Sequence, residues 1–372
     1  MAMADPATID AIEQALATVM EPELHRDIVS LQMVKNLRFE GGTVSLDILL
    51  TTPACPLKDR IEEGIRDALV GRVPGVESVV VSWDSSVTRG ARGLPGRQEI
   101  PGVKNAFAVS AGKGGVGKTT VSVNVAIALA QAGAHVGLLD ADIYGPNVPI
   151  MLGLQEAPRA AESGKMLPLR AYGIEVVSFG TILKPGQPVM WRGPMLGKAL
   201  REFLYEVEWG ELDYLVIDLP PGTGDVQISL AQSIPLTGSV VVTTPQDVSL
   251  ADVSRGIQMF SQLRLPVLGV VENMSGFVCA HCGERTDVFG TGGGRQLADR
   301  YGIPFLGEIP LDPRVRLGGG DGQPLMAAAP DSPVGRVFRS IAEHIAAEVS
   351  KENFASEGGP QMPGAPRMAV RG

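Results

Sequence analysis

Cysteine is scarce in this chain, with three in 372 residues. Three cysteines cannot build the disulfide framework that stabilises small secreted domains. The three thiols are Cys55, Cys279 and Cys282, and the last two form a Cys-x-x-Cys motif. Each thiol is therefore either an inert packed residue or a reactive or metal-binding group. The sequence around each thiol indicates which interpretation fits better.

Long apolar runs and excess positive charge are also missing. No unbroken apolar segment reaches the roughly 20 residues that a membrane-spanning helix needs. The formal net charge of −9 argues against broad electrostatic binding to nucleic acid or to anionic lipid. Acidic residues stand within Met1–Glu13, where a signal peptide would have a basic start and an apolar stretch. We therefore expect a cytoplasmic protein that binds neither nucleic acid nor membrane.

The periodicity of apolar residues predicts a small α+β domain over residues 1–87. Its expected elements are a helix around 9–19, strands 34–39 and 44–50 joined at Gly41-Gly42, a helix over 57–70 and a closing strand over 76–83. Residues 88–104 are rich in glycine, proline and basic residues with little to bury, which predicts a linker. Residues 355–372 are rich in Gly, Pro and Ser, and we expect a disordered tail there.

Residues 105–354 alternate apolar runs of strand length with helical patterns. The expected strands are 107–110, 136–140, 176–179, 214–219, 239–243, 267–271 and 305–307, and the main helices are 119–131, 195–207, 249–263 and 334–349. Continuous Val, Ile and Leu strands separated by helices indicate a mostly parallel sheet covered by helices on both faces. The predicted fold class of this larger domain is therefore α/β.

A glycine-rich segment after the first of these strands matches the phosphate-binding pattern G-x-x-x-x-G-K-[ST] in full. It reads Gly112-Lys113-Gly114-Gly115-Val116-Gly117-Lys118-Thr119. In such a loop, backbone N–H groups converge on a phosphate, Lys118 neutralises its oxygens and Thr119 supplies a Mg²⁺ ligand. The segment therefore predicts an ATP site. The second lysine, Lys113, could reach phosphates bound to a neighbouring protomer, although its spacing alone favours a solvated loop lysine.

Carboxylates stand at the ends of two expected strands, at the edge of a parallel sheet where ligands bind. Asp140 could hold Mg²⁺ through water, and Asp142 could orient or deprotonate the attacking water. The alternative for both is a pair of solvated loop acids. Asp218 ends a buried strand, which is the arrangement that delivers one carboxylate to the Mg²⁺ shell. The following segment, 219–225, contains glycines that permit hinge motion near a γ-phosphate.

The motif Cys279-Ala280-His281-Cys282 is expected in a loop between Met274 and Gly290. Redox chemistry would favour a helix N-terminus early in the domain, so metal binding is the better interpretation. A tetrahedral zinc or an iron–sulfur cluster usually needs four protein ligands, and one chain supplies two thiolates. A two-fold dimer would supply four at its axis. The alternative is a pair of reduced loop thiols.

Cys55 lies between Ala54 and Pro56, at the expected start of a helix. A helix N-terminus favours thiolate over thiol, so Cys55 could be a transient iron or cluster ligand or could contact a partner protein. A small buried residue at a turn is an equally good interpretation.

Several of these motifs together resemble a known group of ATPases. The segment from Ser110 to Thr120 resembles the deviant Walker A motif of the MinD/ParA/nitrogenase-iron-protein ATPases, which are P-loop NTPases. The segments 140–147, 218–225 and 272–275, followed by the Cys-x-x-Cys, resemble its Mrp/ApbC branch of iron–sulfur cluster carriers. Residues 1–87, with Thr51–Pro56, resemble the Fe–S assembly domain that is often fused to them.

The resemblance implies roles for particular residues. Lys113 would contact the partner's phosphates across a nucleotide-sandwich homodimer, and Asp225 would transmit nucleotide state to the dimer interface. Asn273 would contact adenine, although a turn-forming asparagine is a rival interpretation there. Cys279 and Cys282 would hold a [4Fe–4S] cluster across the dimer.

The sequence thus predicts a homodimeric ATPase that accepts clusters from scaffold donors and passes them to apoproteins. ATP and Mg²⁺ would be its cofactors, and ATP would gate the dimer through Asp142 and Asp225. Two alternatives stay open: a spatial organiser of the MinD or ParA kind, and an ATPase dimer with a structural zinc. The acidic balance and the Gly/Pro-rich tail argue against the organiser.

Overall fold

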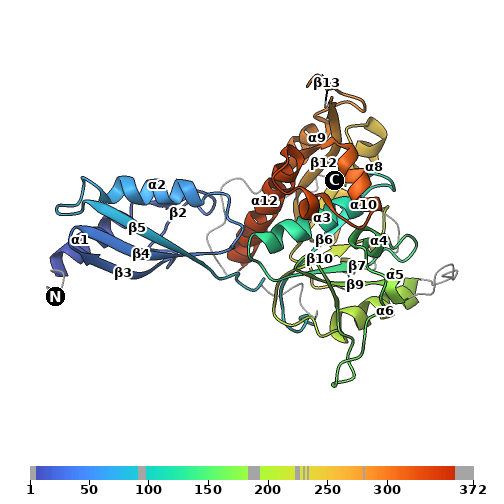
Figure 1. Cartoon of the computed structure of the whole chain (residues 1–372), viewed down its shortest axis with the longest axis horizontal. Helices are drawn as coiled ribbons and strands as arrows, with labels where there is room; N and C mark the ends of the chain where they lie inside the picture. Colours follow the sequence, from blue (N-terminus) through green and yellow to red (C-terminus); the bar gives the residue numbers. More distant parts are fainter. Residues whose placement is uncertain are drawn as a thin grey trace. The chain divides into compact units, whose positions relative to one another are not determined.

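The computed structural model describes residues 6–90, 98–182, 193–222, 227–228, 231–232, 234–279 and 281–356. The chain divides into two compact units, Met1–Thr88 and Arg89–Gly372 (Figure 1). Each unit has its own apolar core. Among the described residues, no helix combines the length and the apolar character needed to cross a bilayer.

The first unit is a small α+β fold. Strand β3 (Val34–Glu40) pairs antiparallel with β4 (Thr43–Leu50), and β4 pairs parallel with β5 (Ser78–Ser85). Alternate residues of β4 are buried in a core shared with α1 (Pro6–Leu16) and α2 (Lys58–Leu69). Two short strands, β1 (Met20–Glu21) and β2 (Arg26–Asp27), pair with each other. Gly41 and Gly42 both have positive φ, as the tight β3–β4 turn requires, so the predicted hairpin is confirmed.

The second unit is built on one nine-stranded sheet in the described part of the chain. Its order is β13-β12-β11-β6-β10-β7-β9-β8, with β14 also paired to β12. The strands are β6 (Val103–Ala111), β7 (Val136–Asp140), β8 (Leu169–Ala171), β9 (Ile174–Ser178), β10 (Leu212–Asp218), β11 (Gly238–Thr243), β12 (Val267–Val278), β13 (Arg285–Thr286) and β14 (Phe305–Leu311). Only β8 and β13 are antiparallel to their neighbours, so the predicted mostly parallel sheet is confirmed.

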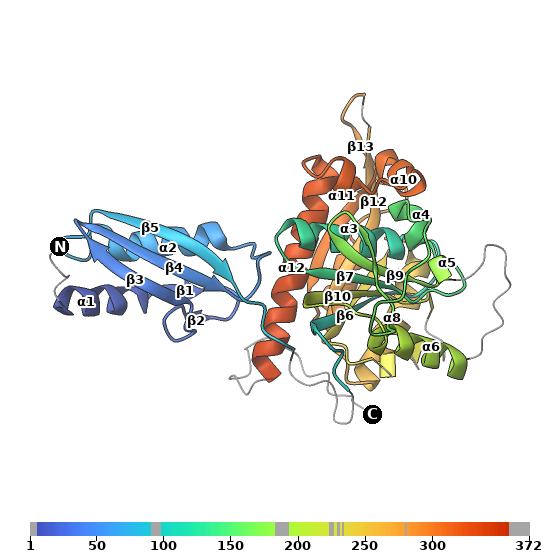
Figure 2. The same cartoon turned by 60° about the horizontal axis from the view of Figure 1, so that its bottom comes forward.

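Helices cover both faces of this sheet (Figure 2). Helix α3 (Lys118–Gln131) contacts β6, β7 and β10, and α12 (Pro333–Ser356) contacts α3 and β14. On the opposite face, α6 (Gly193–Tyr205) and α8 (Asp247–Gln262) share a core with alternate residues of β6 and β10. The shorter helices are α4 (Val148–Leu152), α5 (Phe179–Ile182), α9 (Gly293–Tyr301), α10 (Pro313–Gly320) and α11 (Leu325–Ala328).

Three predicted boundaries are wrong. Strand β12 does not end at 271 but continues to Val278, because its second half pairs with β13 and β14 although Asn-Met-Ser-Gly resembles a turn. Ile100 is buried in the second core, so the end of the predicted linker belongs to the second unit. Helix α12 extends to Ser356, beyond the expected start of the tail. Residues 357–372 lie outside the described residues.

Candidate functional site

The phosphate-binding loop joins the end of β6 to the first turn of α3. Gly115 and Gly117 have φ of 82° and 84°, a left-handed conformation that glycine adopts without strain. A Cβ atom at Gly112 would lie 2.6 Å from the backbone of Asp252, so this position also has no room for a side chain. The fold therefore supports the glycine-rich loop that the sequence predicts, immediately before a helix N-terminus.

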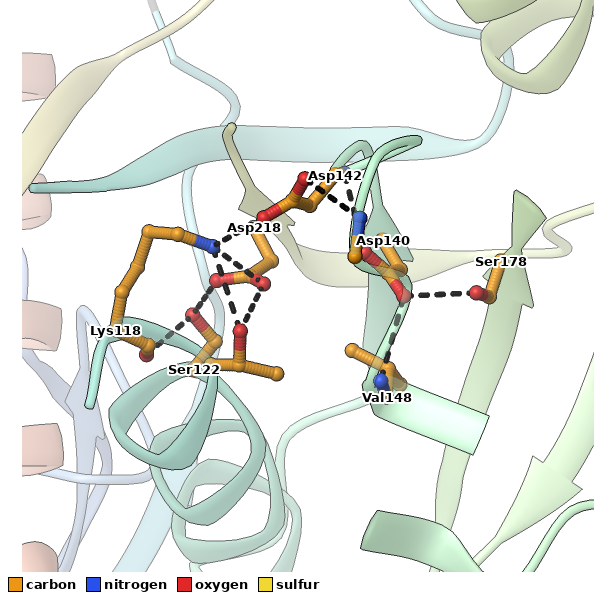
Figure 3. Close-up of polar contacts among 9 residues, drawn as sticks. Lys118, Ser122, Asp140, Asp142, Val148, Ser178 and Asp218 are labelled. Atoms are coloured by element: carbon orange, nitrogen blue, oxygen red, sulfur yellow. Dashed lines mark hydrogen bonds and ion pairs between the residues drawn. The ribbon is translucent and has the colours of Figure 1, made fainter. Parts of the chain in front are cut away.

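The loop lysine is held by carboxylates at the end of the sheet (Figure 3). Lys118 Nζ lies 2.7 Å from Asp218 Oδ2 and 3.9 Å from Asp142 Oδ2. Thr119 Oγ1 also donates to Asp218 Oδ2, at 2.8 Å, and Ser122 Oγ donates to Asp218 Oδ1, at 2.5 Å. The side chains of Lys118 and Asp218 are 6 % and 0 % exposed, so this is a buried and fully bonded network.

Asp140 and Asp142 lie close together but face different partners. Asp140 accepts hydrogen bonds from Ser178 Oγ at 2.8 Å and from the backbone N–H groups of Asp142 and Val148. Burial, and then the charge of Asp218, raise the pKa of Asp140 to about 8. Burial also raises the pKa of Asp142, while Lys118 opposes that rise. Asp140 thus fixes the turn that carries Asp142.

A cavity of about 510 Å³ lies over the loop, and this volume suits a nucleotide. The loop contributes Lys113, Gly114, Gly115, Gly117, Lys118, Thr119 and Thr120, and the rest of the lining is Asp142, Gly145, Asn147, Ile150, Met151, Pro221, Val315, Arg316 and Gly319. The loop thus faces side chains from α4, α10 and the segment that follows β7.

The Cys-x-x-Cys motif lies at the tip of the hairpin formed by β12 and β13. Cys279 N–H donates to Glu284 O at 2.9 Å, and Gly283 N–H donates to Cys279 O at 2.8 Å. Cys279 is half-buried and Cys282 is exposed. Backbone N–H groups of Cys282 and His281 lower the pKa of Cys279, because they stabilise its thiolate. The tip therefore presents one half-buried and one exposed thiol, and metal binding by Cys279 and Cys282 stays a prediction.

Comparison with known proteins matches both units. A family model described as "NUBPL iron-transfer P-loop NTPase" matches residues 102–346, and one described as "Iron-sulfur cluster assembly protein" matches residues 9–83. The chain belongs to the family of iron-transfer P-loop NTPases.

Relatives at high identity cover almost the whole chain. Proteins named iron–sulfur cluster carrier protein from Synechocystis and Deinococcus radiodurans are each 49 % identical over 92 % of this chain and 98 % and 95 % of their own lengths. The Escherichia coli protein of that name is 40 % identical over 90 % of each chain.

Solved structures resemble the second unit. An Archaeoglobus fulgidus nucleotide-binding protein in complex with ADP has a TM-score of 0.55 and 40 % identity over 60 % of this chain and 88 % of its own. The cell-division ATPase MinD of Pyrococcus furiosus has a TM-score of 0.50 at 23 % identity, over 65 % of this chain and 98 % of its own, which shows a shared fold. The predicted P-loop NTPase fold is confirmed.

The structure brings most of the predicted nucleotide-site residues of this iron-transfer NTPase together. Lys113, Lys118, Thr119, Thr120 and Asp142 line one cavity. Asp225 lies outside the described residues.

Five predicted site residues that the structure describes lie outside the cavity lining: Gly112 and Val116 of the loop, Asp218 beneath Lys118, and Asn273 and Asp140. Asn273 is buried, and its amide donates to Val116 O of the loop at 2.8 Å, so its contact with adenine stays a prediction. Asp140 is fully buried with its carboxylate turned to Ser178 and α4. Its role in holding Mg²⁺ through water also stays a prediction.

Of the two interpretations of Cys55, the structure favours the buried residue at a turn, and its role as a transient cluster ligand stays a prediction. Helix α2 begins at Lys58, and the Cys55 thiol packs against the core of the first unit. Burial raises its pKa to about 11, and this exceeds the lowering by the backbone N–H of Leu57. Cys55 therefore behaves as a packed residue in this fold.

Sequence reasoning missed Ser122 and Arg316. Ser122 is one helical turn after Lys118, and this spacing on a helix that follows the loop could have indicated it. Arg316 lies on α10, lines the cavity and makes no ion pair with any residue that the structure describes. No local sequence motif indicates Arg316, because α10 is far from the loop in the sequence and only the fold brings the two together.

Proposed function

We propose that this chain is an ATP-hydrolysing carrier of iron–sulfur clusters that acts as a homodimer in the cytoplasm. The observation that carries the proposal is the position of the Cys-x-x-Cys, at an accessible hairpin tip of a P-loop NTPase unit. Curated relatives that are 39–49 % identical over most of the chain bear the name iron–sulfur cluster carrier protein.

The number of thiols supports a shared cluster. In the described part of the chain, no group of three or more His, Cys, Asp or Glu side chains is placed to hold a metal ion. A [4Fe–4S] cluster takes four thiolates, and Cys279 and Cys282 of two copies supply four around a two-fold axis. Transfer then needs only ligand exchange, in which thiolates of a recipient apoprotein replace those of the carrier without a change of oxidation state. A scaffold donor would load the cluster by the reverse exchange.

ATP binding would use the network already described. On ATP binding, the Lys118 ammonium would exchange its ion pair with Asp218 for one with the phosphates. Asp142 would orient the attacking water that converts ATP to ADP and phosphate. Thr119 Oγ1 and Asp218 Oδ2 lie 2.8 Å apart, an oxygen pair that fits Mg²⁺. When bound, Mg²⁺ would neutralise charge on the phosphates.

Nucleotide gating of the dimer completes the proposal. Lys113 has no ion-pair partner among the described residues and lines the cavity, so its ammonium is available for phosphates bound to the partner copy. Asp142 and Asp225 would report the nucleotide state to the dimer interface.

Anaerobic reconstitution tests the proposal. Protein purified without air is incubated with iron and sulfide, and iron, zinc, labile sulfide and oligomeric state are then measured. We expect four iron and four sulfide per dimer in the wild type, and none in Cys279→Ser/Cys282→Ser. Cys55→Ser is the matched control and keeps the full cluster. If the double variant holds as much cluster as the wild type, Cys279 and Cys282 are not the cluster ligands. If the protein contains zinc and no sulfide, the alternative of an ATPase dimer with a structural zinc is favoured.

A further inference from the structure

Two adjacent residues of β12 connect the nucleotide loop to the cysteine hairpin. Neighbouring side chains on a strand point to opposite faces of the sheet. Asn273 contacts the nucleotide loop, whereas Glu272 contacts the base of the hairpin. We propose that the Glu272–Asn273 pair is a coupling element that transmits occupancy of the nucleotide loop to the position of Cys279 and Cys282. This inference rests on the proposed function.

The side chain of Asn273 contacts the backbone of the nucleotide loop. Asn273 Nδ2 donates to Val116 O at 2.8 Å, and its Oδ1 accepts from Met274 N–H at 2.9 Å. The amide nitrogen also occupies the place that a Cβ of Gly117 would take, so it contacts the residue immediately before α3. A change in loop conformation at Gly117 must therefore displace Asn273 and the strand that carries it.

The Glu272 side closes the base of the hairpin. The Glu272 carboxylate is fully buried and accepts from Ser275 Oγ at 2.6 Å, from Gly292 N–H at 2.9 Å and from Gly294 N–H at 2.5 Å. Ser275 stands just before the segment 276–291 that carries the thiols, and Gly292 stands just after it. One carboxylate thus holds both ends of the segment, and it lies at the N-terminus of α9, where negative charge is favoured.

Further contacts make this base stiff. Arg285 donates from Nη2 to Thr291 Oγ1 at 3.0 Å and from Nε to Asp287 at 3.1 Å. Thr291 Oγ1 lies 3.3 Å from Ser275 Oγ. Because the base is cross-linked in this way, a movement of Glu272 shifts the whole hairpin instead of being absorbed within it.

The test measures how nucleotide changes the reactivity of the hairpin thiols. Cluster-free protein is alkylated with iodoacetamide in the presence of ADP or Mg–ATP, and the rates at Cys279 and Cys282 are followed by peptide mass spectrometry. In the wild type we expect the two nucleotides to give rates that differ by about fivefold or more, as for coupled sites in general. Glu272→Gln should remove this difference and Ser275→Ala should reduce it, while Ser275→Thr retains it.

Matched controls separate coupling from folding. Glu284→Gln makes the same charge change at an exposed position of the hairpin, and Thr286→Ala removes an exposed hydroxyl; both should respond to nucleotide like the wild type. ATP affinity and the thermal midpoint are measured for every variant. If Glu272→Gln and Ser275→Ala bind ATP and still show the full difference in alkylation rate between ADP and Mg–ATP, the coupling element is overturned. The proposal that the protein carries clusters is not affected by that result. If the wild type shows no response, the proposed gating fails as well.

Discussion

The nucleotide pocket and the cysteine hairpin differ in how their reactive groups are held. Lys118 and Asp218 are buried and bonded to each other, whereas Cys279 and Cys282 lie at the tip of a two-stranded hairpin. Removing one partner of a buried pair leaves an uncompensated charge, so the pocket geometry is strongly fixed. The thiols are held by backbone hydrogen bonds of Cys279 at the tip and by the contacts at the base of their hairpin. The pocket therefore holds Lys118 and Asp218 in a buried ion pair, while the hairpin tip leaves the thiols of Cys279 and Cys282 at the surface.

The largest effect should separate the two regions. Lys118→Ala removes the cation between Asp218 and Asp142, and we expect ATP hydrolysis to fall by about 10²–10³-fold, the usual cost of losing one preorganised electrostatic group. Alkylation of Cys279 and Cys282 without nucleotide should match the wild type. Lys198→Ala, at an exposed position of α6, is the control and should leave both rates unchanged. Hydrolysis that survives in Lys118→Ala would show that the pocket is not the hydrolytic site.

The parts of this site that were predictable from sequence are those that local chemistry dictates. The loop glycines, Lys118 and Thr119 must follow one another at fixed spacing, and Asp218 must end a buried strand. The Cys-x-x-Cys is likewise local. Its hairpin was not predicted, because the pairing of β12 with β13 overrides a turn-like sequence.

The parts that were not predictable depend on contacts made by the fold. In the sequence, Glu272 is one acid at the end of a predicted strand. Its proposed coupling role depends on hydrogen bonds from the backbone N–H groups of Gly292 and Gly294, which only the folded structure brings to it. Asp140 was predicted at the right strand end, but Ser178 turns its carboxylate away from the cavity. Cys55 shows the same limit, because its burial, which decides its pKa, is set by the core of the first unit.

A second prediction sharpens the pocket side of the comparison. Ser122 holds Asp218 Oδ1 while Thr119 and Lys118 hold Oδ2, so Ser122 should keep this carboxylate oriented after a nucleotide draws the other two away. In Ser122→Ala we expect the Mg²⁺ concentration for half-maximal ATP binding to rise by about ten- to a hundredfold, as for other groups that orient metal ligands. ATP binding without Mg²⁺ should be unchanged.

The control for Ser122 is Ser254→Ala. Ser254 Oγ bonds the carbonyl one turn back on α8, as Ser122 Oγ does on α3, but it contacts no carboxylate among the described residues. An equal Mg²⁺ dependence in Ser122→Ala and the wild type would mean that Asp218 needs no such support.

The third prediction compares the hairpin with the buried thiol of the first unit. Thiolate, the reactive form, accumulates above the pKa, which is about 11 for Cys55 and below the ordinary 9.0 for Cys279. At neutral pH the thiolate fraction of Cys279 should exceed that of Cys55 by about 100-fold or more. The weaker nucleophilicity of a low-pKa thiolate removes about tenfold of this advantage.

We therefore expect Cys279 to be alkylated at least about tenfold faster than Cys55 near neutral pH. Its rate should also level off at a lower pH, while the Cys55 rate still rises. Iodoacetamide labelling across a pH series, resolved by peptide, measures both profiles. If the labelling rates of Cys279 and Cys55 reach half of their maxima at the same pH, the two thiols do not differ in thiolate stabilisation and this prediction is wrong.

The smallest effect concerns Arg316, which lines the cavity from α10 and has no ion-pair partner among the described residues. Its exposed guanidinium should contribute to phosphate binding by up to about 1 kcal/mol, so Arg316→Ala should weaken ATP binding about two- to fivefold. The loss should shrink as salt rises, because salt screens exposed charges. Arg314→Ala is the matched control: this neighbouring arginine is bonded to Asp312 and does not line the cavity. If both variants weaken ATP binding equally, the effect comes from the charge of α10 as a whole and not from a contact made by Arg316.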